Sequence, residues 1–279
     1  MKISYFPNQA ALNSPPIMTA FLDSCRAQGW EVVKDSIDAD AVVIWSVLWA
    51  GRMRANQQVY EHYRKLNKPV FILEVGNLVR GTTWRISVNN VNGNGIFGEG
   101  NDPNRPNLLK VQLRTRPNLL KTQPILIAGQ RGDSLQWQNQ PDVSTWVNNT
   151  IKQLREHTMR PIVVRPHPRF PIGSITGATI ENPRAVIGSY DGWNLDYQQY
   201  QCVVNYNSGP SVQAVINDVP VICDTSSLAA DMSIAYSEIE NPPGRDRSNW
   251  FINLCQTEYL IDEIAAGVPL IKLQKVLFS

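Results

Sequence analysis

The sequence predicts an α/β protein whose sheets are parallel and doubly wound. Two observations carry this prediction. Short apolar runs alternate with segments of helical spacing, and several runs are apolar at every position, as in strands covered on both faces. Residues 41–47 (AVVIWSV) and 69–75 (PVFILEV) are two such runs. Because 43% of the 279 residues are hydrophobic and 18% are charged, the chain can bury a sizeable core.

The first half alternates strand and helix. We expect strands at 2–6, 30–33, 41–47 and 69–75, and helices at 17–28 and 56–65. The spacing of Met18, Phe21, Leu22 and Cys25 places them on one apolar face, which predicts the first helix. Residues 76–107, in contrast, are rich in Gly and Asn and lack strong periodicity. A connection of this length is usually functional or mobile.

The second half repeats the alternation. We expect strands at 124–128 and 161–164, a helix at 144–157, and a strand, loop, helix and strand in succession over 203–224. Residues 249–264 predict a terminal amphipathic helix that is closed by Gly267. The domain boundary is placed just before this second run of strands, which gives domains 1–122 and 123–279. The last helix is a candidate to cross back to the first domain.

Composition excludes several classes of protein. The four cysteines are scattered without a CxxC pair, so neither a zinc site nor a disulfide framework is expected. No apolar run reaches the roughly 18 to 20 residues that span a bilayer. The N-terminus enters a strand pattern without the apolar core of a signal peptide. We therefore expect a cytoplasmic protein that has no membrane partner.

The charges are unevenly distributed along the chain. Residues 1–125 carry 15 Lys and Arg against 9 Asp and Glu, whereas the remainder carries 11 against 15. The hexapeptide RPNLLK occurs at 105–110 and again at 116–121, in a stretch without acidic residues. This pattern favours an anionic partner for the first half, and chance scatter of charge is the alternative. The basic residues of the stretch are Arg105, Lys110, Arg114, Arg116 and Lys121.

Three loops of the second half carry groups that suit a phosphate. Each follows a predicted strand, and the carboxyl ends of parallel strands meet at one edge of a sheet. Arg can form a bidentate fork, His can donate a hydrogen bond, and a helix N-terminus offers a positive dipole. The alternative is that these are ordinary turns and that the histidine is structural. The candidate residues are Gln130, Arg131, Asp133, Ser134, Arg165, His167, Arg169, Asn207, Ser208, Gly209 and Ser211.

These segments resemble a known family. Residues 130–134, the Arg-Pro-His-Pro segment 165–168, and the Asn-Ser-Gly loop 207–209 with its following helix are similar to the C-terminal half of GT-B glycosyltransferases. The most similar types are the capsule-polysaccharide (Kdo-transferase-like) enzymes and related phage glycosyltransferases that modify hydroxymethylated bases of DNA. Residues 247–267 resemble the closing segment of the same group, so the resemblance covers about 124–270.

The resemblance implies two Rossmann-like domains facing a cleft. The C-terminal domain would hold a nucleotide-sugar such as UDP-glucose as co-substrate, and the N-terminal domain would hold the acceptor. No cofactor and no metal are expected, because Arg, His and a helix N-terminus would neutralise the leaving diphosphate. The chain departs from the family at Gln213, where a Glu is usual. An amide can hydrogen-bond a ribose without charge, so the nucleotide stays open.

An inverting transfer also needs a carboxylate that takes the proton of the acceptor hydroxyl. Glu74, which ends the apolar run 69–75, is the first candidate for this base, and His167 is the second catalytic candidate. Glu99 and Asp102 are further candidates for the base. An ion pair of Glu74 with Arg80 or Arg85 is the alternative to a catalytic role.

The leading hypothesis for the acceptor is 5-hydroxymethylated cytosine in double-stranded phage DNA. Arg and Lys would contact its phosphates, and Trp84 with Arg85 would contact an exposed base. No nucleic-acid-binding motif is visible, and the alternative is a solvated basic face with buried tryptophans. Three other functions stay open: transfer to a capsule or lipopolysaccharide-type glycan, a nucleotide-sugar 2-epimerase, and a non-catalytic nucleotide-sugar-binding protein.

Overall fold

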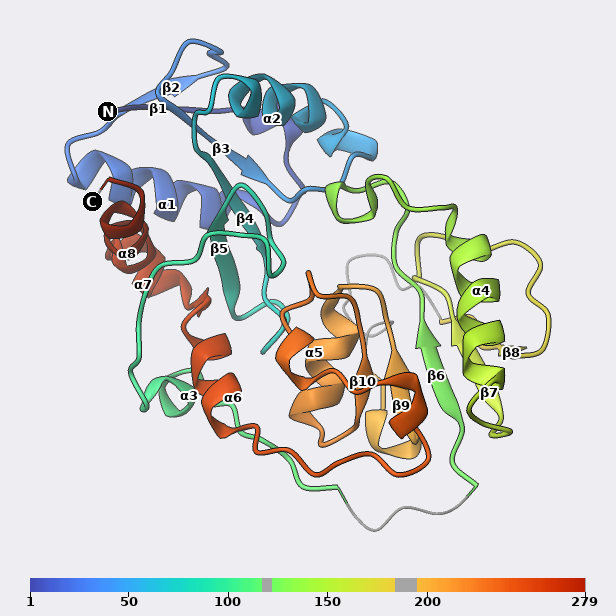
Figure 1. Cartoon of the computed structure of the whole chain (residues 1–279). Helices are drawn as coiled ribbons and strands as arrows, with labels where there is room; N and C mark the ends of the chain where they lie inside the picture. The colour runs from blue at the N-terminus through green and yellow to red at the C-terminus, as the bar shows by residue number, and fades with distance from the viewer. Residues whose placement is uncertain (117–121, 184–194, 279) are drawn as a thin grey trace. The chain divides into compact units, whose positions relative to one another are not determined.

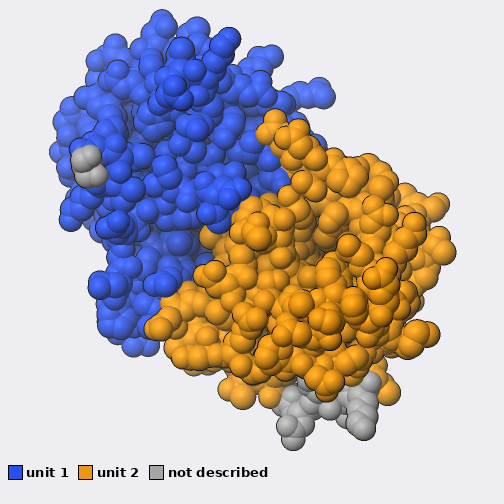
Figure 2. All heavy atoms as spheres, viewed as in Figure 1, with its two compact units in different colours: residues 1–111, 133–136, 252–279 blue, residues 112–132, 137–251 orange. Residues whose placement is uncertain are grey.

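The computed structural model describes residues 1–116, 122–183 and 195–278. These residues form two compact units, which Figure 2 shows in blue and orange. Unit 1 comprises residues 1–111, 133–136 and 252–279, and unit 2 comprises residues 112–132 and 137–251. The sequence analysis divided the chain once, between 122 and 123. In the structure the chain passes between the units several times, and its C-terminal segment belongs to unit 1.

Unit 1 is built on a six-stranded sheet with the order β11-β5-β4-β3-β1-β2 (Figure 1). Strands β1, β2, β3 and β4 are parallel, as predicted. Strand β5 is antiparallel to β4, and β11 is antiparallel to β5. The strands are β1 (Lys2–Tyr5), β2 (Glu31–Lys34), β3 (Ala41–Trp45), β4 (Val70–Val75), β5 (Trp84–Val88) and β11 (Glu258–Tyr259).

Strand β5 corrects the prediction that residues 76–107 form an irregular connection. All five of its residues are buried, and it pairs with β4 along its whole length. The sequence Trp-Arg-Ile-Ser-Val does not predict a buried strand, because its polar residues interrupt the continuous apolar run that such a strand usually shows. The same stretch also contains the short helix α3 (Arg105–Leu108).

The C-terminal part of the chain is another correction. The single helix expected over 249–264 is divided into α6 (Ser248–Cys255), β11 and α7 (Ile261–Ala265), and α8 (Val268–Leu277) follows. The division arises because Glu258 and Tyr259 pair with β5 at Arg85 and Trp84. Extended backbone at these two positions ends one helix and separates it from the next.

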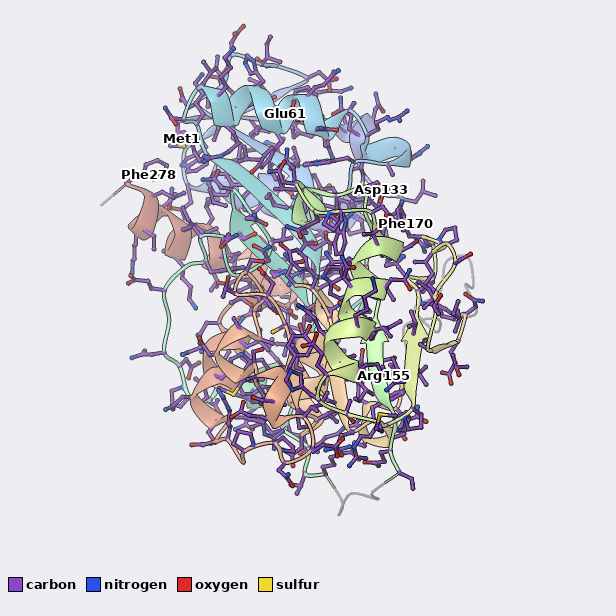
Figure 3. The ribbon with its side chains drawn as sticks, turned by 45° about the vertical axis from the view of Figure 1, so that its right-hand side comes forward. Met1, Glu61, Asp133, Arg155, Phe170 and Phe278 are labelled. Atoms are coloured by element: carbon purple, nitrogen blue, oxygen red, sulfur yellow. The ribbon has the colours of Figure 1, made fainter. Side chains whose placement is uncertain are left out.

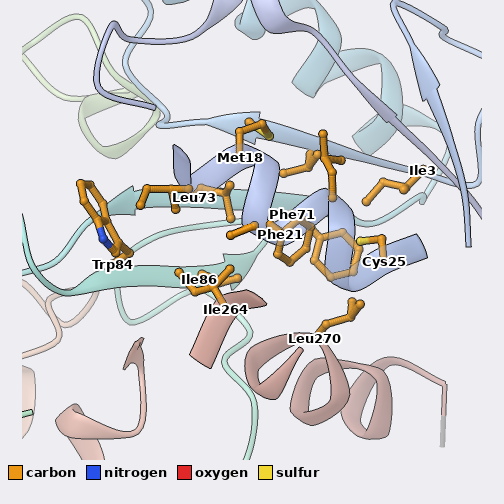
Figure 4. Packing of buried hydrophobic residues seen from close by; sticks show 14 of the residues in the cluster. Ile3, Met18, Phe21, Cys25, Phe71, Leu73, Trp84, Ile86, Ile264 and Leu270 are labelled. Atoms are coloured by element: carbon orange, nitrogen blue, oxygen red, sulfur yellow. The ribbon is translucent and has the colours of Figure 1, made fainter. Parts of the chain in front are cut away.

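Helices cover both faces of the sheet of unit 1. Helix α1 (Pro15–Ala27) packs on one face together with α7 and α8, and their core includes Phe21, Phe71, Leu73, Ile86 and Leu270 (Figure 4). Helix α2 (Asn56–Lys65) has the predicted bounds, and its Val59 and Tyr63 belong to the core of the opposite face. Both faces of the central strands are therefore buried, as their unbroken apolar runs predict.

Unit 2 is built on a five-stranded sheet with the order β10-β9-β6-β7-β8, and all its strands are parallel. The strands are β6 (Ile125–Ala128), β7 (Ile162–Arg165), β8 (Thr179–Ile180), β9 (Cys202–Val204) and β10 (Val221–Ile222). Helix α4 (Val143–Arg155) begins at Asp142, whose side chain caps the N–H groups of Ser144 and Thr145, and ends at Arg155 (Figure 3). Helix α5 (Gly209–Ile216) connects β9 to β10.

Strand order decides where the loops of unit 2 lie. Strand β6 is central, with β9 on one side and β7 on the other. Because all are parallel, the segments that follow β6, β7, β9 and β10 leave the sheet at the same edge. Among the described helices of the chain, none combines the length and the apolar character needed to cross a bilayer.

Candidate functional site

The three loops predicted to share one sheet edge do lie together in unit 2. Gln130, which follows β6, donates from Nε2 to Oδ1 of Asn207 at 3.0 Å, and the N–H of Asn207 donates to Gln130 Oε1 at 3.1 Å. On the other side, Gly129 lies so close to the loop after β7 that a Cβ would sit 3.3 Å from the Cα of Pro166. The loop after β6 therefore contacts both neighbouring loops.

A fourth loop, after β10, completes the edge, and the sequence analysis did not identify it. Asn207 donates from Nδ2 to Ser226 Oγ at 2.9 Å, and Ser226 donates to Asp224 Oδ1 at 2.5 Å. The hydroxyls of Ser211 and Ser227 are 2.9 Å apart. A signal was available, because the run Asp-Thr-Ser-Ser directly follows the last predicted strand of this half.

Gln130, Asn207 and Ser211 hold the loops in place. All three side chains are buried, and the partners described above occupy their polar atoms; Ser211 Oγ also donates to the carbonyl of Ser208 at 2.8 Å. Buried polar groups are stable when they are hydrogen-bonded in this way. The structure therefore places these three predicted donor-binding residues in a scaffold under the site surface.

His167 is oriented by the backbone that follows it. The N–H of Arg169 donates to His167 Nδ1 at 3.0 Å, and the N–H of Phe170 donates to the His167 carbonyl at 2.9 Å. In the neutral imidazole the proton is then on Nε2, because Nδ1 accepts. The ring is half-buried and can present an Nε2–H donor to an oxyanion.

Ser208 occupies the N-cap position of α5, yet its hydroxyl does not cap the helix. Its N–H donates to Asn205 Oδ1 at 2.8 Å, and its Oγ lies 3.1 Å from Asn205 Nδ2. Asn205 in turn donates to the carbonyl of Ala128 at 2.7 Å, which ties the start of α5 to the end of β6. The remaining predicted donor residues are half-buried or exposed, namely Arg131, Arg165, Arg169, Gly209 and Gln213.

Asp133 and Ser134 differ from the other predicted donor-binding residues, because they belong to unit 1. The carbonyl of Asp133 accepts from the Trp49 N–H at 2.8 Å, and Ser134 forms a β-bridge with Leu48. Their segment extends the backbone pairing next to β3 and is not part of the cluster of loops in unit 2.

Glu74 lies near the carboxyl end of β4 in unit 1 and is half-buried. Ser46, just beyond β3, donates from Oγ to Glu74 Oε2 at 2.6 Å, and the Val75 N–H donates to Oε1 at 2.8 Å. Among the described residues, Glu74 forms no ion pair with Arg80 or Arg85, the alternative considered from the sequence. The sequence analysis missed Ser46, although a serine inside the apolar run 41–47 was a signal. Glu99 and Asp102 are exposed.

Two of the residues predicted to bind an acceptor have structural roles. Trp84 is buried in the core of unit 1, with its ring 5.8 Å from that of Trp45. Arg105 is 4% exposed, forms an ion pair with Glu263, and donates to the carbonyls of Cys255 and Glu258. Both side chains therefore contribute to the packing of unit 1.

The rest of the basic stretch is divided between the units. Lys110 is exposed in unit 1, whereas Arg114 donates to Asn217 Oδ1 at 3.3 Å in unit 2. Arg116 contacts the Tyr200 carbonyl and donates to Gln123 Oε1 at 2.8 Å, and burial lowers the pKa of Arg116 to about 10. Lys121 lies outside the described residues. The described basic residues of the stretch therefore belong to two different units.

Comparisons with known proteins bear on the fold. The chain matches no protein-family model and no curated protein. Among solved structures it is similar to KpsC beta-Kdo 2,4 transferase of Thermosulfurimonas dismutans, with a TM-score of 0.55 and 13% identity over 96% of this chain and 98% of that one. It is also similar to KpsC beta-Kdo 2,7 transferase of the same organism, with a TM-score of 0.50 and 13% identity over 98% and 100%.

At this identity the likeness concerns the fold alone, and it confirms the predicted α/β, GT-B-like class. Within residues 1–116, 122–183 and 195–278, no three His, Cys, Asp or Glu side chains are grouped so that they could hold a metal ion. The expected independence from metal stays a prediction.

Proposed function

We propose that the protein is a glycosyltransferase that moves a sugar from a nucleotide-sugar to an acceptor hydroxyl. The observation that carries the proposal is the edge of unit 2, where the loops after β6, β9 and β10 are joined by hydrogen bonds and the loop after β7 carries an oriented His167. The fold likeness to two Kdo transferases supports the same reading.

Unit 2 would bind the donor. Nucleotide-sugars carry their negative charge on phosphate, and an imidazole N–H, guanidinium groups and a helix N-terminus stabilise such charge. Arg165 and His167 follow β7 and the start of α5 follows β9, so these groups lie at two strand ends on either side of β6. Because cationic side chains are present, the proposed reaction needs neither a metal nor a resident cofactor.

Unit 1 would supply the base. The acceptor oxygen attacks the anomeric carbon, the bond from that carbon to the phosphate oxygen breaks, and the nucleotide leaves with the electron pair. Glu74 takes the hydroxyl proton, so the transfer inverts the anomeric centre. The hydrogen bond from Ser46 fixes one carboxylate oxygen of Glu74.

We further propose that the acceptor is a glycan hydroxyl. This choice departs from modified DNA, the hypothesis favoured by the sequence, because Trp84 and Arg105 are buried and the basic stretch is divided. DNA containing 5-hydroxymethylcytosine is the second acceptor to be assayed.

The test is nucleotide release from a panel of UDP-, CMP-, ADP- and GDP-sugars, with glycan or hydroxymethylated DNA as acceptor. Wild-type protein should release one nucleotide and form a glycosylated product. His167→Ala should lower the rate at least about 100-fold, the lower range for a proton donor in a transition state. The exposed His157 of unit 2 provides a matched control, His157→Ala, which should keep the wild-type rate.

Each alternative function predicts another result in this assay. Conversion of a UDP-sugar to its 2-epimer without an acceptor would indicate an epimerase. Tight nucleotide-sugar binding without product would indicate a non-catalytic binder. Wild-type turnover by His167→Ala would contradict the assigned site.

A further inference from the structure

Three charged residues lie next to one another on adjacent strands of the sheet of unit 1. Glu74 on β4 is directly opposite Arg85 on β5, and Arg85 is directly opposite Glu258 on β11. Residues directly opposite each other in antiparallel strands point to the same face. This is the face that α2 covers, since Ile72 and Ile44 on it belong to the core with Val59 and Tyr63.

Arg85 is the unusual one of these three residues. The residue is only 7% exposed, and its Nε is fully buried with no hydrogen-bond partner among the described residues. A guanidinium stays charged at any physiological pH and has five N–H donors. A buried charge without hydrogen-bond acceptors is costly, so native proteins rarely leave one without a role.

The two acids beside Arg85 are engaged by other groups. Glu74 accepts from Ser46 and Val75. Glu258 is completely buried and accepts from the N–H groups of Asn77 and Leu78 and from the hydroxyl of Thr83. Within the described residues, neither carboxylate forms an ion pair with Arg85. The two acids therefore lie beside Arg85 on the neighbouring strands without accepting from its buried Nε.

We propose that the guanidinium of Arg85 binds an oxyanion of the acceptor, a carboxylate or a phosphate, next to Glu74. The inference rests on the proposed function and names the acceptor class as an acidic sugar. A planar guanidinium matches the two oxygens of either group, and pairing with one would satisfy the orphaned donors. Because Arg85 is only 7% exposed, the ligand is a small acidic glycan unit. The backbone of a DNA duplex is too large to contact Arg85 at this position.

The experiment measures binding without catalysis. Glucuronate, glucose 6-phosphate and glucose are titrated by calorimetry into wild-type protein, Arg85→Met and Lys65→Met. Methionine keeps much of the volume of arginine without its charge. Lys65→Met removes one positive charge from the exposed C-terminal end of α2 and is the matched control.

Wild-type protein and Lys65→Met should bind at least one of the two anionic sugars about tenfold more tightly than glucose, and Arg85→Met should lose this preference. The preferred anion distinguishes a carboxylate from a phosphate. Equal binding of all three sugars by the wild type, or an unchanged preference in Arg85→Met, would overturn the proposal.

Two further readouts separate this inference from others. If Arg85 had a structural role, the Arg85→Met variant would be less stable than the wild type. We expect instead that the thermal midpoint of Arg85→Met equals or exceeds that of the wild type. Failure of this variant to fold would contradict the proposal. His167→Ala should keep the preference, because it alters unit 2. The binding measurement requires neither donor nor turnover, so the proposed transferase activity can fail or succeed independently of it.

Discussion

The sheet edges of the two units are organised in different ways. In unit 2, neutral amides and hydroxyls join the strand-end loops, as in the contacts of Gln130, Asn207 and Ser226. In unit 1, the corresponding level of the sheet carries Glu74, which accepts from Ser46 and Val75, and Arg85, whose buried Nε has no hydrogen-bond partner among the described residues. Neutral groups connect the loops of unit 2, whereas acidic and basic side chains lie side by side on the strands of unit 1.

This difference fits a division of labour. Neutral hydrogen-bonded networks cost less to bury than charges and hold backbone groups rigidly, which suits preorganised binding of a donor phosphate. A base must stay ionised and must reach a proton, so it cannot be locked into ion pairs. Among the residues that the structure describes, Glu74 of unit 1 forms no ion pair, although an arginine lies directly opposite on the next strand.

The largest expected effect comes from removing the base of unit 1. Glu74→Gln keeps the shape and the hydrogen bond from Ser46 but cannot accept a proton, so kcat should fall by about 10² to 10⁴. Donor binding, measured by calorimetry, should not change. The control is Glu61→Gln at an exposed position of α2. A rate within about threefold of wild type would remove Glu74 from the mechanism.

Arg105 offers the next largest effect, on stability. Arg105→Met breaks the buried ion pair with Glu263 and leaves a carboxylate without its partner, at a cost of about 3–5 kcal/mol in the free energy of unfolding. Urea denaturation measures this loss. Lys110→Met, in the same basic stretch but exposed, should cost less than about 0.5 kcal/mol. Equal effects would contradict the structural role of Arg105.

A smaller effect is expected from the frame of unit 2. Gln130→Ala removes two hydrogen bonds to Asn207 and should lower the free energy of unfolding by about 1–3 kcal/mol. Nucleotide affinity should fall with it, because the loops after β6 and β9 lose their connection. Gln153→Ala, exposed on α4, is the control. Unchanged affinity in Gln130→Ala would show that the frame does not support binding.

The sequence predicted those parts whose patterns are local. Helix α2 has the predicted bounds, and the strands in unbroken apolar runs lie within about two residues of their predicted positions, because burial on both faces leaves a clear signal. Strand β5 was missed because polar residues interrupt its apolar run, and β11 was missed because its two residues pair with residues 84–85, far away in the sequence.

The meeting of the three loops of unit 2 at one sheet edge could also be predicted. Parallel strands bring their following loops to one edge, so the meeting of residues near 130, 166 and 207 could be foreseen. Burial could not be foreseen: Arg105 looks like a surface charge until Glu263 is placed beside it. Asp133 and Ser134 follow β6 in sequence, yet they pair with the segment after β3.

Hydrogen exchange measured by mass spectrometry, with and without the nucleotide identified by the release assay, tests most directly that unit 2 binds the donor and unit 1 does not. Bound nucleotide should slow amide exchange in residues 129–132, 166–170, 205–212 and 223–229, and should leave residues 70–88 unchanged. Protection confined to residues 70–88, or no protection in the loops of unit 2, would contradict the assignment of the two edges.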